Sequence, residues 1–230
     1  MAAADSGTVV LSSLALKGVL ERFRPEFEKA LGAPLDLRFD ATQAILGRLA
    51  QGERADLLVL TDEAMETLRK AGKVRQARAL GSSGVGVAVR AGARKPDIGS
   101  VEALKRALLS AASVAHSKVG ASGIYFAEVL KQLGIDDSLK KRVVVDKGPV
   151  GAVVARGEAE LGVQQLCELA PVPGIDIVGP LPEPLQKLTF FAAGIPANAA
   201  HSDSALQLLG LLRSDASRAA MIESRIDPAP

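Results

Sequence analysis

The 230-residue sequence has few of the residue types that form cross-links, aromatic surfaces and metal sites. It contains one cysteine (Cys167), no tryptophan, one tyrosine and two histidines. A single cysteine excludes a disulfide within the chain and leaves the redox compartment open. Aromatic residues make up 3% of the chain, which argues against a surface that stacks nucleic-acid bases. Two histidines cannot build a multi-histidine metal site, so we expect no bound metal.

Charge and hydropathy exclude further classes. Lys and Arg (28) are interspersed with Asp and Glu (26), and no basic stripe is available to follow a nucleic-acid backbone. No apolar run approaches the roughly 20 residues of a membrane-spanning helix. We therefore expect neither a nucleic-acid partner nor a membrane-embedded chain. A hydrophobic content of 48% is enough for a globular core.

The common catalytic motifs are also missing. There is no phosphate loop with Gly-Lys-Ser/Thr and no Gly-x-Ser-x-Gly elbow. The glycine-rich run at 81–86 precedes a predicted strand instead of following one, so it does not fit a dinucleotide site, and we expect no cofactor. Cys167 fits a small buried hydrophobic residue better than a nucleophile. His116 is either a hydrogen-bonded residue at a strand end or a proton shuttle.

Hydrophobic periodicity alternates between strand and helix along almost the whole chain. This alternation predicts an α/β fold of mostly parallel sheets flanked by helices. A helix is expected from Leu16 to Leu31, with a kink at Pro25 and an end at Gly32. Ser100 is expected to cap a helix over 101–109. Strands are expected at 8–11, 35–39, 56–60, 85–89, 112–115, 142–146, 160–163, 175–178 and 187–193.

The most informative segment is Ser-Lys-Val-Gly-Ala-Ser-Gly-Ile-Tyr at 117–125, which joins a predicted strand to a predicted helix. Helix N-termini have unpaired N–H groups and a positive dipole end, so small residues and hydroxyls there favour anion binding. The alternative is that Ser122 is an ordinary N-cap. Two other turns between a strand and a helix carry hydroxyls, Ser12-Ser13 and the turn that includes Thr42.

Ligands of parallel sheets bind beyond the carboxyl ends of the strands. We therefore expect Ser12, Ser13, Thr42 and Ser122 to line one cleft. Gln164 and Gln165 are expected directly after a strand, where they act as uncharged ligand donors or form a polar loop.

The order of segments resembles the molybdate-binding type of periplasmic solute-binding protein over nearly the whole chain. The resemblance rests on Ser12-Ser13 after the first strand, Phe-Glu-Lys-Ala-Leu-Gly at 27–32, Gln-Gly-Glu-Arg-Ala-Asp at 51–56, Gly-Ala-Ser-Gly at 120–123 and Val-Ala-Arg-Gly-Glu-Ala-Glu at 154–160. Ala15-Leu16-Lys17 and Gln164-Gln165-Leu166-Cys167 depart from the molybdate branch. These positions look more like a side branch that includes aconitate isomerase-like enzymes.

The resemblance implies a two-lobed fold of the type II periplasmic class, joined by a hinge. One lobe would comprise 1–81 with 194–230, and the other 82–193. The implied function is to capture a small anion between the lobes, in the periplasm, and to deliver it to a membrane transporter of the ABC type. The expected ligand-binding residues are Ser12, Ser13, Thr42, Lys118, Ala121, Ser122, Gly123, Tyr125, Gln164 and Gln165. The short N-terminal segment has no secretory signal, and we expect such a signal to have been removed.

Two other functions stay open. An isomerase that shifts a double bond in a tricarboxylate would need an acid–base group, for which His116, Tyr125 and Asp40 are the candidates. A cytoplasmic ligand-sensing domain is disfavoured because no DNA-binding helix pair is attached. Lys17 and Lys118 lie beside expected ligand positions and favour an organic carboxylate over an oxyanion.

Overall fold

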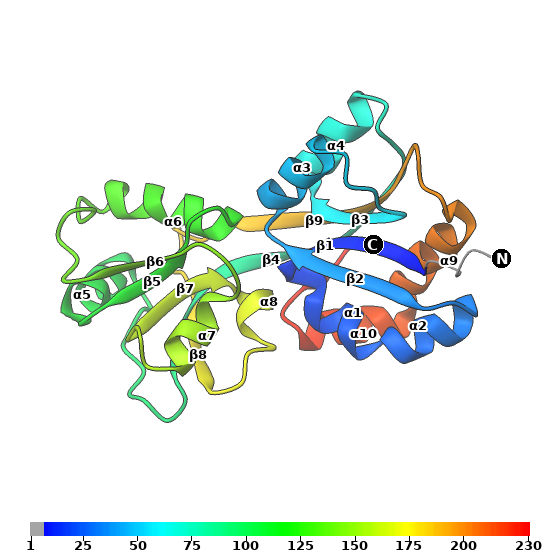
Figure 1. The fold of residues 1–230 in the computed structure, drawn as a ribbon. Helices are drawn as coiled ribbons and strands as arrows, with labels where there is room; N and C mark the ends of the chain where they lie inside the picture. Colours follow the sequence, from blue (N-terminus) through cyan, green and yellow to red (C-terminus); the bar gives the residue numbers. More distant parts are fainter. Residues whose placement is uncertain (1–6) are drawn as a thin grey trace. The chain divides into compact units, whose positions relative to one another are not determined.

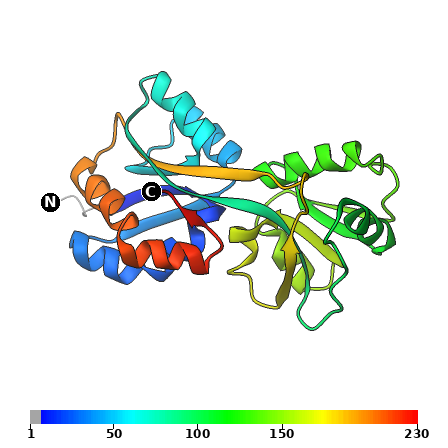
Figure 2. The same cartoon turned by 180° about the vertical axis from the view of Figure 1, so that it is seen from behind.

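The computed structural model describes residues 7–230, which form two compact units. Unit 1 is Met1–Ser82 with Phe190–Pro230, and unit 2 is Ser83–Thr189. The chain enters unit 2 within strand β4 (Val74–Arg90) and returns to unit 1 within strand β9 (Leu188–Pro196). Figures 1 and 2 show both strands from opposite sides.

The sheet of unit 1 has the strand order β2 (Leu35–Asp40), β1 (Thr8–Ser13), β3 (Leu57–Thr61) and β9. The first three are parallel, and β9 is antiparallel to β3. Ser13 lies opposite Asp40 on β2, and Ser12 lies opposite Val59 on β3. The carboxyl ends of three parallel strands therefore meet at one edge, which we call the unit 1 edge.

Helices cover both faces of this sheet. Helices α3 (Thr42–Ala50) and α4 (Asp62–Lys70) lie on one face, and α1 (Lys17–Arg22), α2 (Arg24–Leu31) and α10 (Asp215–Glu223) lie on the other (Figures 1 and 2). Helix α9 (Ser202–Leu212) precedes α10, and the short β10 (Asp227–Pro228) pairs with β4 at Gly81 and Ser82. The core against α3 and α4 includes Leu11, Ile45, Leu58, Leu60 and Met65.

The single helix expected over 16–31 is wrong. A 3₁₀ turn η1 (Leu14–Leu16) leads into α1, the helix breaks at Phe23, and α2 restarts with Pro25 in its first turn. Proline lacks an N–H group and is accommodated only in the first turn of a helix, so the helix restarts just before Pro25 instead of kinking through it. Gly32 ends α2 in the left-handed region, with φ 66°, as predicted.

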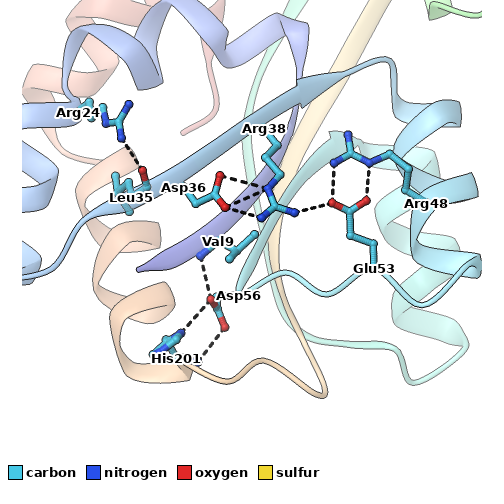
Figure 3. A network of polar contacts seen from close by, with 9 residues as sticks. All are labelled: Val9, Arg24, Leu35, Asp36, Arg38, Arg48, Glu53, Asp56 and His201. Atoms are coloured by element: carbon cyan, nitrogen blue, oxygen red, sulfur yellow. Dashed lines mark hydrogen bonds and ion pairs between the residues drawn. The ribbon is translucent and has the colours of Figure 1, made fainter. Parts of the chain in front are cut away.

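Asp56 ties three segments of unit 1 together (Figure 3). Its buried carboxylate accepts hydrogen bonds from the amide nitrogens of Val9 (2.9 Å), Ala200 (2.8 Å) and His201 (2.8 Å), and lies 3.1 Å from the His201 ring. Burial alone would raise the pKa of Asp56, but these bonds outweigh it and the pKa is lowered.

A second polar network lies on β2 and α3. Arg38 pairs with Asp36 and Glu53, and Arg48 also pairs with Glu53 (Figure 3). Hydrogen bonds from Arg48 and Arg38 hold the pKa of Glu53 at about 2. The network fixes the loop between α3 and β3 against the sheet.

The sheet of unit 2 consists of β8 (Ile175–Pro180), β4, β7 (Leu161–Gln165), β5 (Val114–Ser117) and β6 (Arg142–Val145) in that order. Strands β7, β5 and β6 are parallel, and β4 is antiparallel to both β7 and β8. Helices α5 (Val101–Ser110) and α6 (Ala121–Gln132) pack on one face around Leu104 and Phe126. Helix α7 (Val150–Ala155) packs on the other around Val150 and Val154.

The α/β fold class is confirmed, with flanking helices in each unit. The sheets are mixed: in unit 1, β2, β1 and β3 are parallel and β9 is antiparallel, whereas unit 2 has two parallel and two antiparallel pairings. Ser100 caps α5 as predicted, because its Oγ accepts a hydrogen bond from Ala103 N at 3.1 Å. The placement of Gln164 and Gln165 after a strand is wrong, since both lie within β7. No helix formed by residues 7–230 is both long and apolar enough to cross a membrane.

Candidate functional site

Ser13 is the last residue of β1, at the unit 1 edge, and its side-chain hydroxyl has no hydrogen-bond partner among the described residues. The residue is only 4% exposed. Within residues 7–230, its Oγ is the one buried side-chain polar atom without a hydrogen bond. The neighbouring Ser12 Oγ donates to the Ser13 carbonyl at 2.9 Å, so Ser12 is used within the strand. Leaving a buried hydroxyl unpaired is costly, so Ser13 Oγ is a candidate hydrogen-bond donor to a ligand.

Thr42 begins α3 at the same edge. Its Oγ1 accepts a long hydrogen bond, 3.3 Å, from the amide of Thr61 at the end of β3. Asp40 Oδ1 accepts from Ala41 N at 2.8 Å, next to Thr42. The other carboxylate oxygen of Asp40 lies 3.9 Å from Arg48, so Asp40 serves the turn into α3 and an ion pair with that helix.

The loop between β5 and α6 forms part of the corresponding edge of unit 2, which we call the unit 2 edge. Ser117 Oγ accepts from Gly120 N at 2.9 Å and closes the loop. The N-cap of α6 is Gly120, which has no side-chain cap, and Ser122 lies in the first turn, 2% exposed. Ser122 is therefore not the N-cap, and the N-cap interpretation of this serine is wrong.

The start of α6 also depends on close backbone packing. A Cβ on Gly123 would lie 1.9 Å from the Ser117 carbonyl oxygen, so only glycine fits. The amides of Gly123 and Ile124 both donate to Gly120 O, at 3.0 Å each. The N–H groups of Ala121 and Ser122 precede the first hydrogen bonds within the helix. They can therefore donate hydrogen bonds to an anion.

The amides of Gln164 and Gln165 are both committed to the protein. Gln164 Oε1 accepts from Val150 N at 2.8 Å, and its Nε2 donates to the carboxylate of Glu168. In the amide orientation that satisfies its surroundings, Gln165 Nε2 donates to the carbonyls of Ser83 and Gly84, at 2.9 Å each, and Oε1 accepts from Thr189 Oγ1. Gln165 thus holds together the first and last residues of unit 2.

The two lysines expected beside the ligand have acidic partners. Lys118 Nζ lies 2.9 Å from Asp146, with side chains 63% and 71% exposed. Lys17 Nζ lies 3.7 Å from Glu21 and above the ring of Phe39. Both are solvated surface ion pairs, which is the common fate of lysine.

Tyr125 and His116 are engaged within the fold. Tyr125 donates to the Leu185 carbonyl at 3.0 Å, and burial raises the pKa of its hydroxyl. His116 Nδ1 bonds to the Ser117 carbonyl at 2.9 Å, and Nε2 accepts from Arg142 at 2.7 Å. Burial lowers the pKa of His116, so it is neutral near pH 7. These contacts favour the hydrogen-bonded role of His116 over the proton shuttle.

Glu168 was not recognised as a candidate from the sequence. It lies in the short helix α8 (Leu166–Leu169), which follows β7, and it is only partly exposed. Burial raises the pKa of its carboxyl group to about 7, although the hydrogen bond from Gln164 opposes that shift. An acidic residue just after a strand was visible in the sequence, but its burial was not. Within residues 7–230 no group of His, Cys, Asp and Glu side chains is arranged to hold a metal.

Known proteins match the chain over nearly its whole length. The family model described as bacterial extracellular solute-binding protein matches residues 8–224. An aconitate isomerase from Pseudomonas sp is 41% identical, and the match covers 96% of this chain and 87% of that protein.

Solved structures show the same fold. The periplasmic molybdate-binding protein of Azotobacter vinelandii superposes with a TM-score of 0.77 at 20% identity, over 95% of this chain and 98% of that one. The sulfate-binding protein of Mycobacterium tuberculosis gives 0.74 at 16% identity, over 96% and 86%. These likenesses confirm the type II periplasmic-binding-protein fold expected from the segment order.

Proposed function

The chain is a member of the bacterial extracellular solute-binding protein family, and we propose that it binds a small anion through hydroxyl and backbone N–H donors. The observation that carries this proposal is Ser13 Oγ, which is buried without a partner at a strand end where ligands of parallel sheets bind. Hydroxyls and backbone N–H groups stabilise an anion without burying an unpaired positive charge.

The direct contacts are proposed to come from few residues. They are Ser13 and Thr42 in unit 1, and Ala121 and Ser122 at the start of α6 in unit 2. The amide of Gly123 already donates to Gly120 O, so Gly123 would act by keeping this loop tight. Other expected residues already have protein partners and would position these donors; they are Ser12, Lys118, Tyr125, Gln164 and Gln165.

The proposed ligand is an organic di- or tricarboxylate. The support comes from the 41% identical aconitate isomerase, because molybdate- and sulfate-binding structures at 20% identity or below bear on the fold alone. The lysine argument for a carboxylate is weakened, since Lys17 and Lys118 each pair with an acidic residue.

Titration calorimetry with trans-aconitate, citrate, molybdate and sulfate tests the proposal. Saturable binding of a tricarboxylate that is weakened in Ser13→Ala and in Ser122→Ala supports it. Absence of binding for all four anions contradicts it.

A second candidate function is isomerisation of aconitate, which the same relative favours. Moving the double bond takes a proton from the CH₂ carbon and returns one to the former vinyl carbon, so atoms balance without a cofactor. Proton NMR of trans- and cis-aconitate with the protein measures the conversion. Turnover excludes a role in binding alone, and an unchanged ratio over hours excludes the isomerase.

We also propose that the protein acts in the periplasm and passes its ligand to an ABC transporter, as the family assignment suggests. Cell fractionation tests the location, and ligand-dependent stimulation of the transporter's ATPase tests the partner. A cytoplasmic location would contradict both proposals.

A further inference from the structure

Three helices begin at the unit 2 edge. Strands β5, β6 and β7 are parallel, and α6, α7 and α8 follow them directly at their carboxyl ends. Val150 N–H, the first amide of α7, donates to Gln164 Oε1 at 2.8 Å. Gln164 Nε2 in turn donates to Glu168 Oε2. A chain of hydrogen bonds thus runs from the start of α7 to the carboxyl group on α8.

In this series of hydrogen bonds, Glu168 has a carboxyl oxygen that is not yet used. Both ends of the Gln164 amide are used, whereas Glu168 Oε1 has no hydrogen-bond partner in the part of the chain that the structure describes. Glu168 as a whole is partly exposed, and its second carboxyl oxygen is not used within residues 7–230. Protonated, it can donate a hydrogen bond to an anion, and ionised, it can only repel one.

Among the described residues, the elements that pack around Glu168 place no positively charged partner beside its carboxylate. Helix α7 and strand β7 contain no ionisable residue. The ionisable residue of β8, Asp176, accepts a hydrogen bond from Gly92 N. On α8, burial raises the pKa of the neighbouring Cys167 thiol, so it stays neutral. Before α7, Asp146 pairs with Lys118, and among residues 7–230 no ion pair reaches Glu168.

We propose that Glu168 takes up a proton when an anion binds at the unit 2 edge, so that the ligand is captured together with one proton. The inference rests on the proposed anion-binding function. Burial gives the Glu168 carboxyl group a pKa of about 7, so a fraction of the unliganded protein is ionised near neutral pH and can take up a proton. A bound anion disfavours the ionised form further and raises this pKa.

The sign of the pH effect follows from linkage. A ligand that raises the pKa of Glu168 binds more tightly as pH falls through the window above about 7, by up to about tenfold per pH unit. The carboxyl groups of trans-aconitate ionise below this window and stay ionised within it. The ligand itself therefore contributes little to the pH dependence.

Titration calorimetry of the wild type with trans-aconitate tests this at about pH 6, 7 and 8.5 in two buffers of different ionisation enthalpy. We expect proton uptake to approach one per ligand at the highest pH, with the affinity rising as pH falls. Glu168→Gln, which mimics the neutral acid, should bind with a pH-independent affinity and without proton uptake. Glu102→Gln on α5, an exposed position, should behave like the wild type.

The wild-type titration decides the question even if Glu168→Gln fails to fold. Tight binding with no proton uptake and no pH dependence would overturn the role of Glu168 and leave the anion-binding function intact. No binding at any pH would overturn the anion-binding function, and this inference with it. Proton uptake that persists in a folded Glu168→Gln variant would assign the proton to another group.

Discussion

Ser13 and Ser217 are both buried, but they use their hydroxyls differently. Ser217 Oγ donates to the Leu211 carbonyl at 2.8 Å, whereas Ser13 Oγ has no partner. Ser13→Ala should therefore leave the free energy of unfolding unchanged or raise it by up to about 1 kcal/mol, and Ser217→Ala should lower it by about 1 kcal/mol. Urea denaturation of both variants without ligand measures the difference. A clear loss of stability in Ser13→Ala would show that its hydroxyl has a structural partner.

A substitution of Ser122 tests the proposed ligand contact in unit 2. Ser122→Ala should weaken anion binding by about 1–3 kcal/mol, because a ligand oxygen would lose its hydrogen-bond donor in a buried place. Lys131→Ala, exposed on the same helix, is the matched control and should bind like the wild type. Equal affinities for the two variants in calorimetry would count against a direct contact from Ser122.

The hydroxyl of Thr42 could be placed at a helix start from the sequence, because the alternating pattern locates the elements. Ser12 and Ser13 were expected in a turn, but they are the last two residues of β1. The state of Glu168, Gln164 and His116 could not be found that way. Their hydrogen bonds reach residues up to 26 positions away, and burial sets the pKa shifts of Glu168 and His116. Such partners are fixed only when the sheet assembles.

The start of α6 is the element whose geometry matters most for binding. Gly123→Ala would place a Cβ 1.9 Å from the Ser117 carbonyl, so the loop must shift and both stability and anion affinity should fall. Gly210→Ala in α9 meets no atom within 4 Å and should stabilise the protein by about 0.5–1 kcal/mol. Melting temperatures report stability, and calorimetry reports affinity. An unperturbed Gly123→Ala would contradict the close packing of the loop.

Asp56 joins β1 and β3 to the start of α9, and its lowered pKa gives stability a pH dependence. Its contribution is present above the unfolded pKa of about 3.9 and is lost as pH falls through the lower folded value. Asp56→Asn should lower the melting temperature at neutral pH and flatten the loss of stability in acid. Exposed Asp137→Asn is the control. An unchanged acid limb in Asp56→Asn would assign that limb to other carboxylates, such as Glu53.

Elements with a strong periodic pattern were predicted well, and those that depend on context were not. Strand β4 begins at Val74, whereas the apolar pattern marked only 85–89, because Arg75, Gln76 and Arg78 interrupt it. Pro25 marked a disturbance in the first helix, but the pattern did not distinguish a bend from a break at Phe23 followed by a restart.

For the whole molecule, the comparisons bear on different questions. The molybdate- and sulfate-binding structures show the fold, at 20% identity or below. The 41% identical aconitate isomerase bears on the ligand, since it matches over 96% of this chain. The central claim is therefore that the proposed ligand of this protein is an organic carboxylate.

Thermal unfolding with trans-aconitate, citrate, molybdate or sulfate, at equal concentration and ionic strength, tests that claim most directly. A ligand that binds only the folded state raises the melting temperature according to its affinity. We predict a larger rise with trans-aconitate or citrate than with either oxyanion. A larger rise with molybdate or sulfate would contradict the claim and assign the protein an oxyanion as its ligand.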